Sequence, residues 1–389
     1  MAIDNKDKKV LNVPPLRFPE FTEEWERKRF KDVCNITTGN KNTQDKSDDG
    51  IYPFYVRSQI VERINSWTFD GEAILTAGDG VGVGKVFHYS TGKIGVHQRV
   101  YILSDFKCDG KYLYSYFAGN FYNRVKRMSA KNSVDSVRME MIADMPISLP
   151  STEEQKKIGH LLALLDERIS TQNKIIEKYE SLIQAICDTL IEAEQHKVEL
   201  SFNDFGEPYS GLSGKSAEDF GEGCQYITYM NVYQNQIIDT TDVGLVKINE
   251  TEQQSVVRYG DILFTLSSET PNEVGMGAVY LGDTYPLYLN SFCFGVRIID
   301  ESKIFPPFLA YYISTKSFRK AVFPLAQGST RFNLQKSDFM KKMFLFPMVE
   351  KQNKIYTALK AYSDKLSIEK HIAKLLCEQK SFLLHQLFI

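Results

Sequence analysis

The chain has 389 residues, of which 43% are hydrophobic and 25% charged, and its formal net charge is −2. This composition supports two or three packed domains and excludes a wholly disordered chain or a fibrous repeat. The near-zero charge gives no global argument for nucleic-acid binding, because a strongly basic domain is the usual signature of such proteins.

The cysteines and the N-terminus indicate a cytoplasmic protein. The six cysteines include no C-x-x-C pair, so we expect neither a disulfide framework nor a zinc site. Residues 1–10 contain lysines but no apolar stretch, which argues against a secretory signal. No apolar run approaches the ~20 residues needed to cross a bilayer.

The first 150 residues predict strands followed by a helix. Short runs rich in β-branched and aromatic residues lie between turn signals at Ile51–Val56, Ala73–Thr76, Lys85–Tyr89 and Arg99–Leu103. A helical pattern follows at Lys111–Lys126. These elements predict an α+β globular domain.

A glycine-rich run, Gly78-Asp-Gly-Val-Gly-Val-Gly-Lys85, lies between two of the predicted strands. Its spacing misses the P-loop pattern by one residue, and Val86 stands where Ser or Thr would hold magnesium. A turn joining two strands is therefore the favoured interpretation. The alternative is a loop whose bare backbone approaches a ligand or a DNA phosphate.

Segment 151–195 predicts one long helix. Ser151 and Glu154 have the spacing of a capping box, just before the first periodic apolar residue. Apolar residues then recur at alternating steps of four and three from Ile158 to Leu190, interrupted once by Gln172. That spacing is the a/d seam of a coiled coil, and a helix of this length spans roughly 60 Å.

The second half of the chain repeats the first. Pro150 and Gln155 match Pro347 and Gln352 at a shift of 197 residues, and the register holds without gaps through the following helix. Gly71-Glu-Ala-Ile-Leu-Thr76 likewise resembles Gly260-Asp-Ile-Leu-Phe-Thr265. We therefore expect an internal duplication that divides the chain into segments 1–150, 151–195, 196–346 and 347–389.

Two such helices predict an antiparallel pair, because a pseudo-two-fold axis reverses direction. The alternative is that each helix packs only on its own globular domain. The expected interface residues occupy the a and d positions of both helices; they are Ile158, Leu162, Leu165, Ile169, Ile176, Tyr179, Ile183, Ile355, Leu359, Tyr362, Leu366, Leu376 and Leu383.

No motif predicts catalysis. The six histidines show no H-E-x-x-H pattern, and no nucleophile elbow or paired carboxylates stand out. Two basic windows at equivalent places, 119–138 and 315–334, instead combine Lys and Arg with Asn, Gln and hydroxyl residues. Phosphates are held by Lys, Arg and hydroxyls, and base edges are read by Arg, Asn and Gln, so we expect two DNA-contacting surfaces.

The whole arrangement resembles the specificity subunit of type I restriction-modification systems. The resemblance is strongest where each long helix begins, at Pro150-Ser-Thr-Glu-Glu-Gln-Lys-Lys-Ile-Gly159 and Pro347…Gln352-Asn-Lys-Ile355. It also includes Trp25…Gly39, Tyr209-Ser-Gly-Leu-Ser-Gly-Lys215 and Gly328-Ser-Thr-Arg-Phe-Asn333. The first dozen residues fall outside it and are expected to form a loose tail.

The resemblance implies two target recognition domains, each reading one half of a bipartite double-stranded DNA target, and a helix pair that sets their spacing. Two modification subunits would dock on the helices and methylate adenine with S-adenosylmethionine. Two restriction subunits that use ATP and Mg²⁺ would join them, and this chain would hold no catalytic residue, cofactor or metal. The alternatives are a two-headed protein-binding scaffold and an enzyme with an unrecognised site.

The candidate DNA-binding residues combine cationic, amide and hydroxyl side chains. In the first half they are Lys41, Asn42, Arg57, Lys131, Asn132, Ser133 and Arg138, and in the second half Lys215, Asn231, Gln327, Ser329, Thr330, Arg331 and Asn333.

Overall fold

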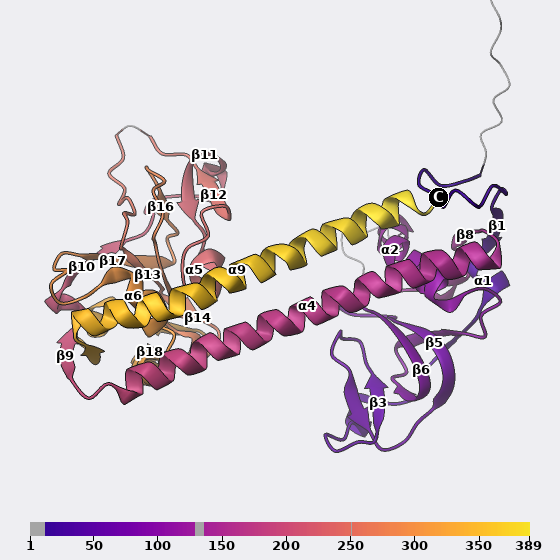
Figure 1. The fold of residues 1–389 in the computed structure, drawn as a ribbon, viewed down its shortest axis with the longest axis horizontal. Coiled ribbons are helices and arrows are strands. Elements are labelled where there is room, and N and C mark those ends of the chain that lie inside the picture. The colour runs from indigo at the N-terminus through magenta and orange to yellow at the C-terminus, as the bar shows by residue number, and fades with distance from the viewer. Residues whose placement is uncertain (1–11, 129–135, 250) are drawn as a thin grey trace, which may run out of the picture. The chain divides into compact units, whose positions relative to one another are not determined.

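The computed structural model describes residues 12–128, 136–249 and 251–389. They form two compact units, the first made of residues 12–173 and 371–389 and the second of residues 174–370. Helices α4 (Thr152–Ala193) and α9 (Val349–Gln386) each contribute one part to each unit (Figure 1). In the described part of the chain, no helix has the length and apolarity of a membrane span.

The first unit is built on a six-stranded sheet with the order β2-β7-β5-β6-β3-β4, in which only β3 and β6 run parallel. Successive side chains of β5 enter different cores, Ile74 on one face and Ala73 and Leu75 on the other, because the side chains of a strand alternate. Its elements are β1 (Glu26–Arg29), α1 (Phe30–Val33), β2 (Asn35–Thr38), β3 (Tyr52–Tyr55), β4 (Glu62–Ile64), β5 (Phe69–Ala77), β6 (Phe87–Val96), β7 (Val100–Ser104), α2 (Gly110–Met128), α3 (Met139–Ala143) and β8 (Pro146–Leu149).

The second unit contains a four-stranded sheet, β10-β17-β13-β15, and smaller sheets around it. Its β13 has the same alternation as β5, with Ile262 and Phe264 in one core and Leu263 in another. Its elements are β9 (Lys197–Ser201), β10 (Gly206–Ser210), β11 (Phe220–Ile227), α5 (Tyr229–Gln234), β12 (Val243–Val246), β13 (Ile262–Thr265), β14 (Ser267–Ser268), β15 (Gly277–Val279), β16 (Tyr288–Leu289), β17 (Cys293–Ile298), α6 (Pro306–Tyr312), α7 (Lys316–Val322), β18 (Ala326–Gln327), β19 (Phe332–Leu334), α8 (Lys336–Lys341) and β20 (Met343–Pro347).

The buried glutamine at the start of each long helix makes the same contacts in both units. The Gln155 side chain accepts a hydrogen bond from the backbone N–H of Asp109 and donates one to the carbonyl of Pro150, at 2.9 and 2.8 Å. Gln352 does the same with Phe305 and Pro347, both at 2.8 Å. The predicted duplication is thus confirmed in three dimensions, down to the polar contacts that join helix and globule.

Within each unit the two helix segments run in opposite directions (Figure 1). In the second unit, Lys370 pairs with Glu180 at 2.8 Å and Lys351 with Glu194 at 3.5 Å. Residue numbers therefore rise along one helix as they fall along the other. In the first unit, Lys380 pairs with Asp166. The predicted antiparallel pairing is therefore confirmed within each unit.

The seam also packs on the globular cores. Ile158 and Leu162 share a core cluster with Leu387, and Ile183 shares one with Ile355 and Leu359. Pairing between helices and packing on a globule, which the sequence posed as alternatives, thus occur together. The remaining predicted seam residues are buried or half-buried except Tyr362; they are Leu165, Ile169, Ile176, Tyr179, Leu366, Leu376 and Leu383.

Tyr362 does not fit the predicted seam, since it is 39% exposed. The neighbouring Ser363 contacts α6 instead, where it accepts a hydrogen bond from the Tyr311 hydroxyl at 2.8 Å. Tyr356, on the same helix, packs its ring against that of Tyr311. Helix α9 therefore presents this part of its surface to α6.

Residues 12–25, which we call the strap, form an extended segment that contacts both long helices in the first unit. The Leu16 N–H donates to the carbonyl of Gln386 at 2.9 Å, and the Arg17 guanidinium makes two 2.8 Å hydrogen bonds to the buried carboxylate of Glu154. This segment therefore joins the start of α4 to the end of α9. Of the dozen residues expected to form a loose tail, residues 1–11 lie outside the described chain, while Asn12 is bonded to Trp25.

Candidate nucleic-acid interface

The glycine-rich run forms a turn between β5 and β6, as its favoured interpretation predicted. A side chain at Gly82 would place its Cβ 2.4 Å from the carbonyl oxygen of Arg57, so only glycine allows this close approach. At the start of the turn, Asp79 forms an antiparallel bridge with Ser136. The turn thereby gathers several loops at one edge of the first unit.

This edge carries a cluster of contacting residues, which we call edge 1: Arg57, Asp79, Arg99 and Ser136. A carboxylate oxygen of Asp79 lies 2.8 Å from Nη1 of Arg57, and the other lies 3.6 Å from Nη1 of Arg99. The Arg57 and Arg99 side chains are 45% and 65% exposed, so both guanidinium groups remain open to a ligand. Two cations around one carboxylate leave the cluster with a net positive charge.

His97 supports this cluster through the backbone of Arg99. The imidazole Nδ1 accepts a hydrogen bond from the Arg99 backbone N–H at 3.0 Å. Burial lowers the pKa of His97, and the guanidinium groups of Arg57 and Arg99 lower it further against the opposing effect of Asp79. The ring is therefore neutral at pH 7 and retains the lone pair that accepts this bond.

Four of the seven residues predicted in the first half reach the same region. Lys41 bridges to His97, and the Asn42 side chain accepts a hydrogen bond from Gln98 at 2.7 Å, which places both beside Arg99. Arg57 belongs to edge 1, and Arg138 precedes α3 only two residues after Ser136. Lys131, Asn132 and Ser133 lie outside the described residues.

In the second unit, five predicted residues lie on one exposed hairpin. Gln327 on β18 pairs with Asn333 on β19, and the tip of the hairpin carries three further exposed residues, Ser329, Thr330 and Arg331. The Arg331 guanidinium carbon lies 5.9 Å from the ring centre of Phe292. We call the group of Tyr229, Ser267, Phe292, Arg331 and Asn333 edge 2.

Lys215 and Asn231, which were predicted as DNA contacts, do not join edge 2. The Lys215 side chain is only 3% exposed, with its ammonium 2.6 Å from the Glu252 carboxylate. The Asn231 amide is buried and donates to the carbonyls of Asp239 and Asp242 at 2.8 and 2.6 Å. Both side chains are engaged in contacts that hold the second unit together.

Edges 1 and 2 have the same main-chain frame. Gly78 donates to the Arg99 carbonyl at 2.8 Å and accepts from Val137 at 2.7 Å. In the second unit, Leu266 donates to the Phe292 carbonyl at 2.9 Å and accepts from the Leu334 N–H at 2.8 Å. Ser267, which follows Leu266, pairs with Asn333, which precedes Leu334, in the same antiparallel way as Asp79 pairs with Ser136. Phe292 is thus the counterpart of Arg99, and Ser267 that of Asp79.

Sequence reasoning missed Asp79 and Arg99. Arg99 stood at the start of a run predicted as a strand, and that strand begins one residue later, at Val100. Asp79 lies within the glycine-rich run, for which only the backbone was considered as a possible ligand contact. The available signal for both residues was a charged side chain at the junction of a turn and a strand. Such a side chain lies at the edge of the sheet, where it can reach a ligand.

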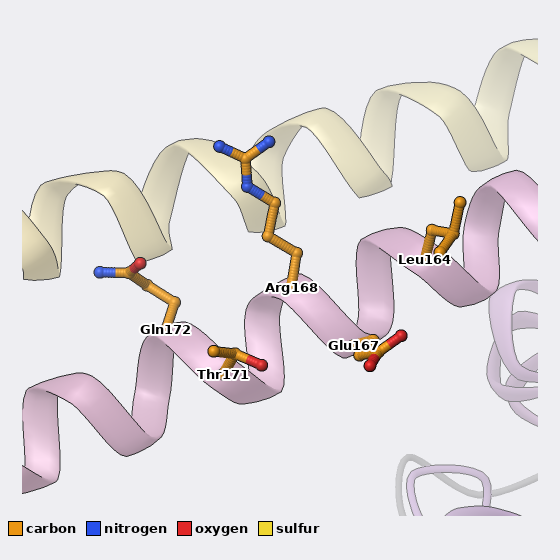
Figure 2. A pocket seen from close by; sticks show the side chains of 5 residues that line it. All are labelled: Leu164, Glu167, Arg168, Thr171 and Gln172. Atoms are coloured by element: carbon orange, nitrogen blue, oxygen red, sulfur yellow. The ribbon is translucent and has the colours of Figure 1, made fainter.

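The described residues offer no metal cluster of three or more His, Cys, Asp or Glu side chains. One hollow lies on the helix pair in the first unit, where Leu164, Glu167, Arg168, Thr171 and Gln172 project from α4 (Figure 2). All of its lining residues come from a single helix, so they do not enclose a small molecule. The hollow is better suited to contact with another surface.

Comparison with known protein families matches the type I restriction modification DNA specificity domain twice, at residues 22–181 and 212–377. The specificity subunit of the type I restriction enzyme EcoDI from Escherichia coli is 27% identical over 161 residues, which cover 41% of this chain and 35% of that subunit. The specificity subunit of the type I restriction enzyme MjaVIII from Methanocaldococcus jannaschii is 23% identical over 94% of this chain and 91% of its own length.

A solved structure has the same fold. The S subunit of a type I restriction-modification system from M. genitalium matches 97% of this chain and 99% of its own, with a TM-score of 0.59 and 16% identity. Both family matches run from a globular part into one of the two long helices, and each includes one of the repeated buried glutamines. The chain therefore belongs to the family of type I restriction-modification DNA specificity subunits and contains two copies of the specificity domain.

Proposed function

We propose that this chain is the non-catalytic, sequence-reading subunit of a type I restriction-modification complex, in which each unit reads one half of a bipartite duplex target. One observation carries the proposal. Two edges with the same main-chain frame present exposed Arg side chains, joined in edge 2 by the exposed Asn333, and these are residue types that pair with base edges in the major groove. The other candidates, Lys41, Ser329 and Thr330, are suited to hold phosphates.

The helix pair would set the gap between the half-sites. At 1.5 Å per residue, the 42 residues of α4 extend over about 63 Å. Both ends of α4 enter a buried core, through Ile158 and Leu162 at one end and through Ile183 and Ile191 at the other. A helix anchored in this way keeps a fixed length and rotation between the residues that it joins.

The helices would also dock two modification subunits. Support comes from large apolar side chains that both helices leave exposed, Leu164 and Phe382 in the first unit and Leu182 and Ile368 in the second, which a docked subunit would cover. S-adenosylmethionine would be bound by those subunits, and ATP and Mg²⁺ by two restriction subunits where present. This chain would contribute recognition and assembly.

Mapping of methylated adenines tests this proposal. The chain is expressed together with its modification subunits in a host without other adenine methylation, and N6-methyladenine is sequenced genome-wide. We expect one bipartite motif with a constant gap, absent when this chain is left out. Methylation without sequence preference, or duplex binding by the complex with no salt dependence, would contradict the proposal and favour a protein-binding scaffold.

A heptad insertion tests the spacing role. Seven residues added to both α4 after Asn173 and α9 after Lys370 preserve the seam and lengthen the pair by about 10 Å. The gap in the motif should grow by up to about three base pairs, because each pair rises about 3.4 Å, while both half-sites stay the same. An unchanged gap would refute the helices as the spacer.

A further inference from the structure

The side chains of edge 1 form a more specific arrangement than a basic patch. Asp79 offers one carboxylate oxygen to Arg57, at 2.8 Å, and the other toward Arg99, at 3.6 Å. Each contact uses a single Nη1 atom. Within the described residues, the rest of each planar guanidinium therefore stays available, on side chains that are 45% and 65% exposed.

The main chain holds this arrangement rigidly. Arg57 is fixed by the close approach of Gly82 to its carbonyl, and Asp79 by its bridge to Ser136. The Arg99 backbone is bonded on both sides, by its N–H to His97 and by its carbonyl to Gly78. The backbone therefore has little conformational freedom left to lose when a ligand binds, and preorganisation of this kind increases both affinity and selectivity.

The chemistry of two preset guanidinium groups favours one base. A guanidinium fork matches the O6 and N7 acceptors of guanine in the major groove, and this is the commonest specific contact between proteins and DNA. A nearby carboxylate disfavours simple attachment to phosphate, because it repels the backbone that lysines and arginines otherwise hold. Edge 2 lacks this pairing, since Ser267 replaces Asp79 and Phe292 replaces Arg99.

We propose that Arg57 and Arg99 are the guanine-reading residues of the first unit, with Asp79 as the residue that positions them. The half-site read by this unit is then anchored on a G·C pair. This inference rests on the proposed function and adds to it a base identity, two specificity-determining residues and a positioning residue.

The test measures base discrimination by the assembled complex with its modification subunits. Once the motif is mapped, duplexes carrying each single-base change in both half-sites are titrated against wild type, Arg57→Ala, Arg99→Ala and Arg99→Lys. Discrimination for one G·C pair of one half-site should fall roughly 10- to 100-fold in Arg99→Ala, the range expected for a bidentate contact. Arg57→Ala should relax the same pair or a neighbouring G·C pair, and Arg63→Ala, an exposed arginine on edge strand β4, is the matched control.

The other variants separate base reading from structural support. Arg99→Lys keeps the charge but loses the fork, so discrimination should fall while the salt dependence of binding is retained. Asp79→Asn should relax the same G·C pair and yet tighten binding to unrelated DNA, because it removes a negative charge near phosphates. A merely structural role for Asp79 would weaken binding to every duplex.

Several results would overturn the inference while leaving the proposed function intact. They are equal weakening on all base variants, relaxation at an A·T pair, and a motif that Arg57→Ala and Arg99→Ala leave unchanged. A complex that methylates without any bipartite motif would instead refute the proposed function, and the guanine assignment with it. Circular dichroism and thermal unfolding of each variant confirm that the first unit has folded.

Discussion

The two units have the same main-chain frame and different chemistry at its edge. In the first unit, the frame carries Asp79 and Arg99, and in the second it carries Ser267 and Phe292 at the equivalent places. The frame is made by backbone hydrogen bonds, which any residue except proline can form. The side chains at the edge can therefore diverge without cost to the fold, which lets duplicated readers acquire different targets.

A second difference lies where each long helix leaves its globule. The buried Glu154 binds Arg17 of the strap, whereas the equivalent residue in the second unit is Lys351, which pairs with Glu194 ahead of β9. The charge at this equivalent position is thus reversed, and in each unit it has a partner of opposite sign. In the first unit the pair is almost entirely buried, but in the second Lys351 is largely exposed, so the two pairs should differ in their importance for stability.

The largest expected effect concerns the aromatic cores. Phe202 and Phe30 are fully buried at equivalent places just after β9 and β1, but Phe202 packs against more rings; its partners are Phe205, Phe264, Phe318, Phe339, Phe344 and Phe346. Phe202→Ala should cost the second unit about 4–5 kcal/mol, and Phe30→Ala the first unit about 3 kcal/mol. Hydrogen exchange of β13 and β5 amides measures each unit separately, and equal losses would contradict this order.

The two ion pairs predict the next largest effect. Glu154→Gln leaves the Arg17 guanidinium without its charged partner in a buried place, so the first unit should lose about 3 kcal/mol of unfolding free energy. Lys351→Gln removes the exposed partner in the second unit and should change little. Thermal unfolding of the two variants makes the comparison. A larger loss in Lys351→Gln than in Glu154→Gln would contradict the order expected from the burial of the two pairs.

Edge 2 predicts an effect on recognition rather than on stability. Arg331→Ala should relax one position of the second half-site by about 1–3 kcal/mol, because its guanidinium projects from an exposed hairpin tip beside Phe292. The first half-site should remain as it is. Binding to single-base variants of both half-sites measures this, and unchanged discrimination at every position would remove Arg331 from the reading residues.

The sequence predicted the parts that rest on periodicity and local chemistry. The seam from Ile158 onward, the Ser151 cap that accepts from Glu154 at 3.4 Å, and the turn at the glycine-rich run all follow from short-range rules. In the second unit, segment 306–322 forms two helices rather than one, because α6 ends at Tyr312 and Thr315 caps the N-terminus of α7 by accepting from the backbone N–H of Phe318. A threonine within a helical pattern was the local sign of that break.

The sequence could not predict the contacts that depend on distant segments. Arg17 lies 137 positions from Glu154, and nothing near either residue indicates the other. Asn231 and Lys215 look like DNA contacts in a sequence because burial is decided by loops that fold over them. Arg99 becomes recognisable as a reader only once the turn from β5 brings Asp79 beside it.

Lys215 predicts the smallest effect and distinguishes a structural cation from a DNA contact. Its hydrogen bond is the main cause that holds the pKa of Glu252 below its usual value near 4.3. Because the folded pKa is lowered, this pair stabilises the second unit above pH ~4.3, and the stabilisation is lost as the pH falls through the folded pKa. Lys215→Met should therefore be less stable than wild type at pH 7, with the difference shrinking on acidification.

The DNA discrimination of Lys215→Met and the salt dependence of its binding should equal those of wild type. Loss of a lysine that holds a phosphate would instead reduce the salt slope by about one. A reduced slope in Lys215→Met would place Lys215 back on the DNA surface and make the second edge more extensive than the first.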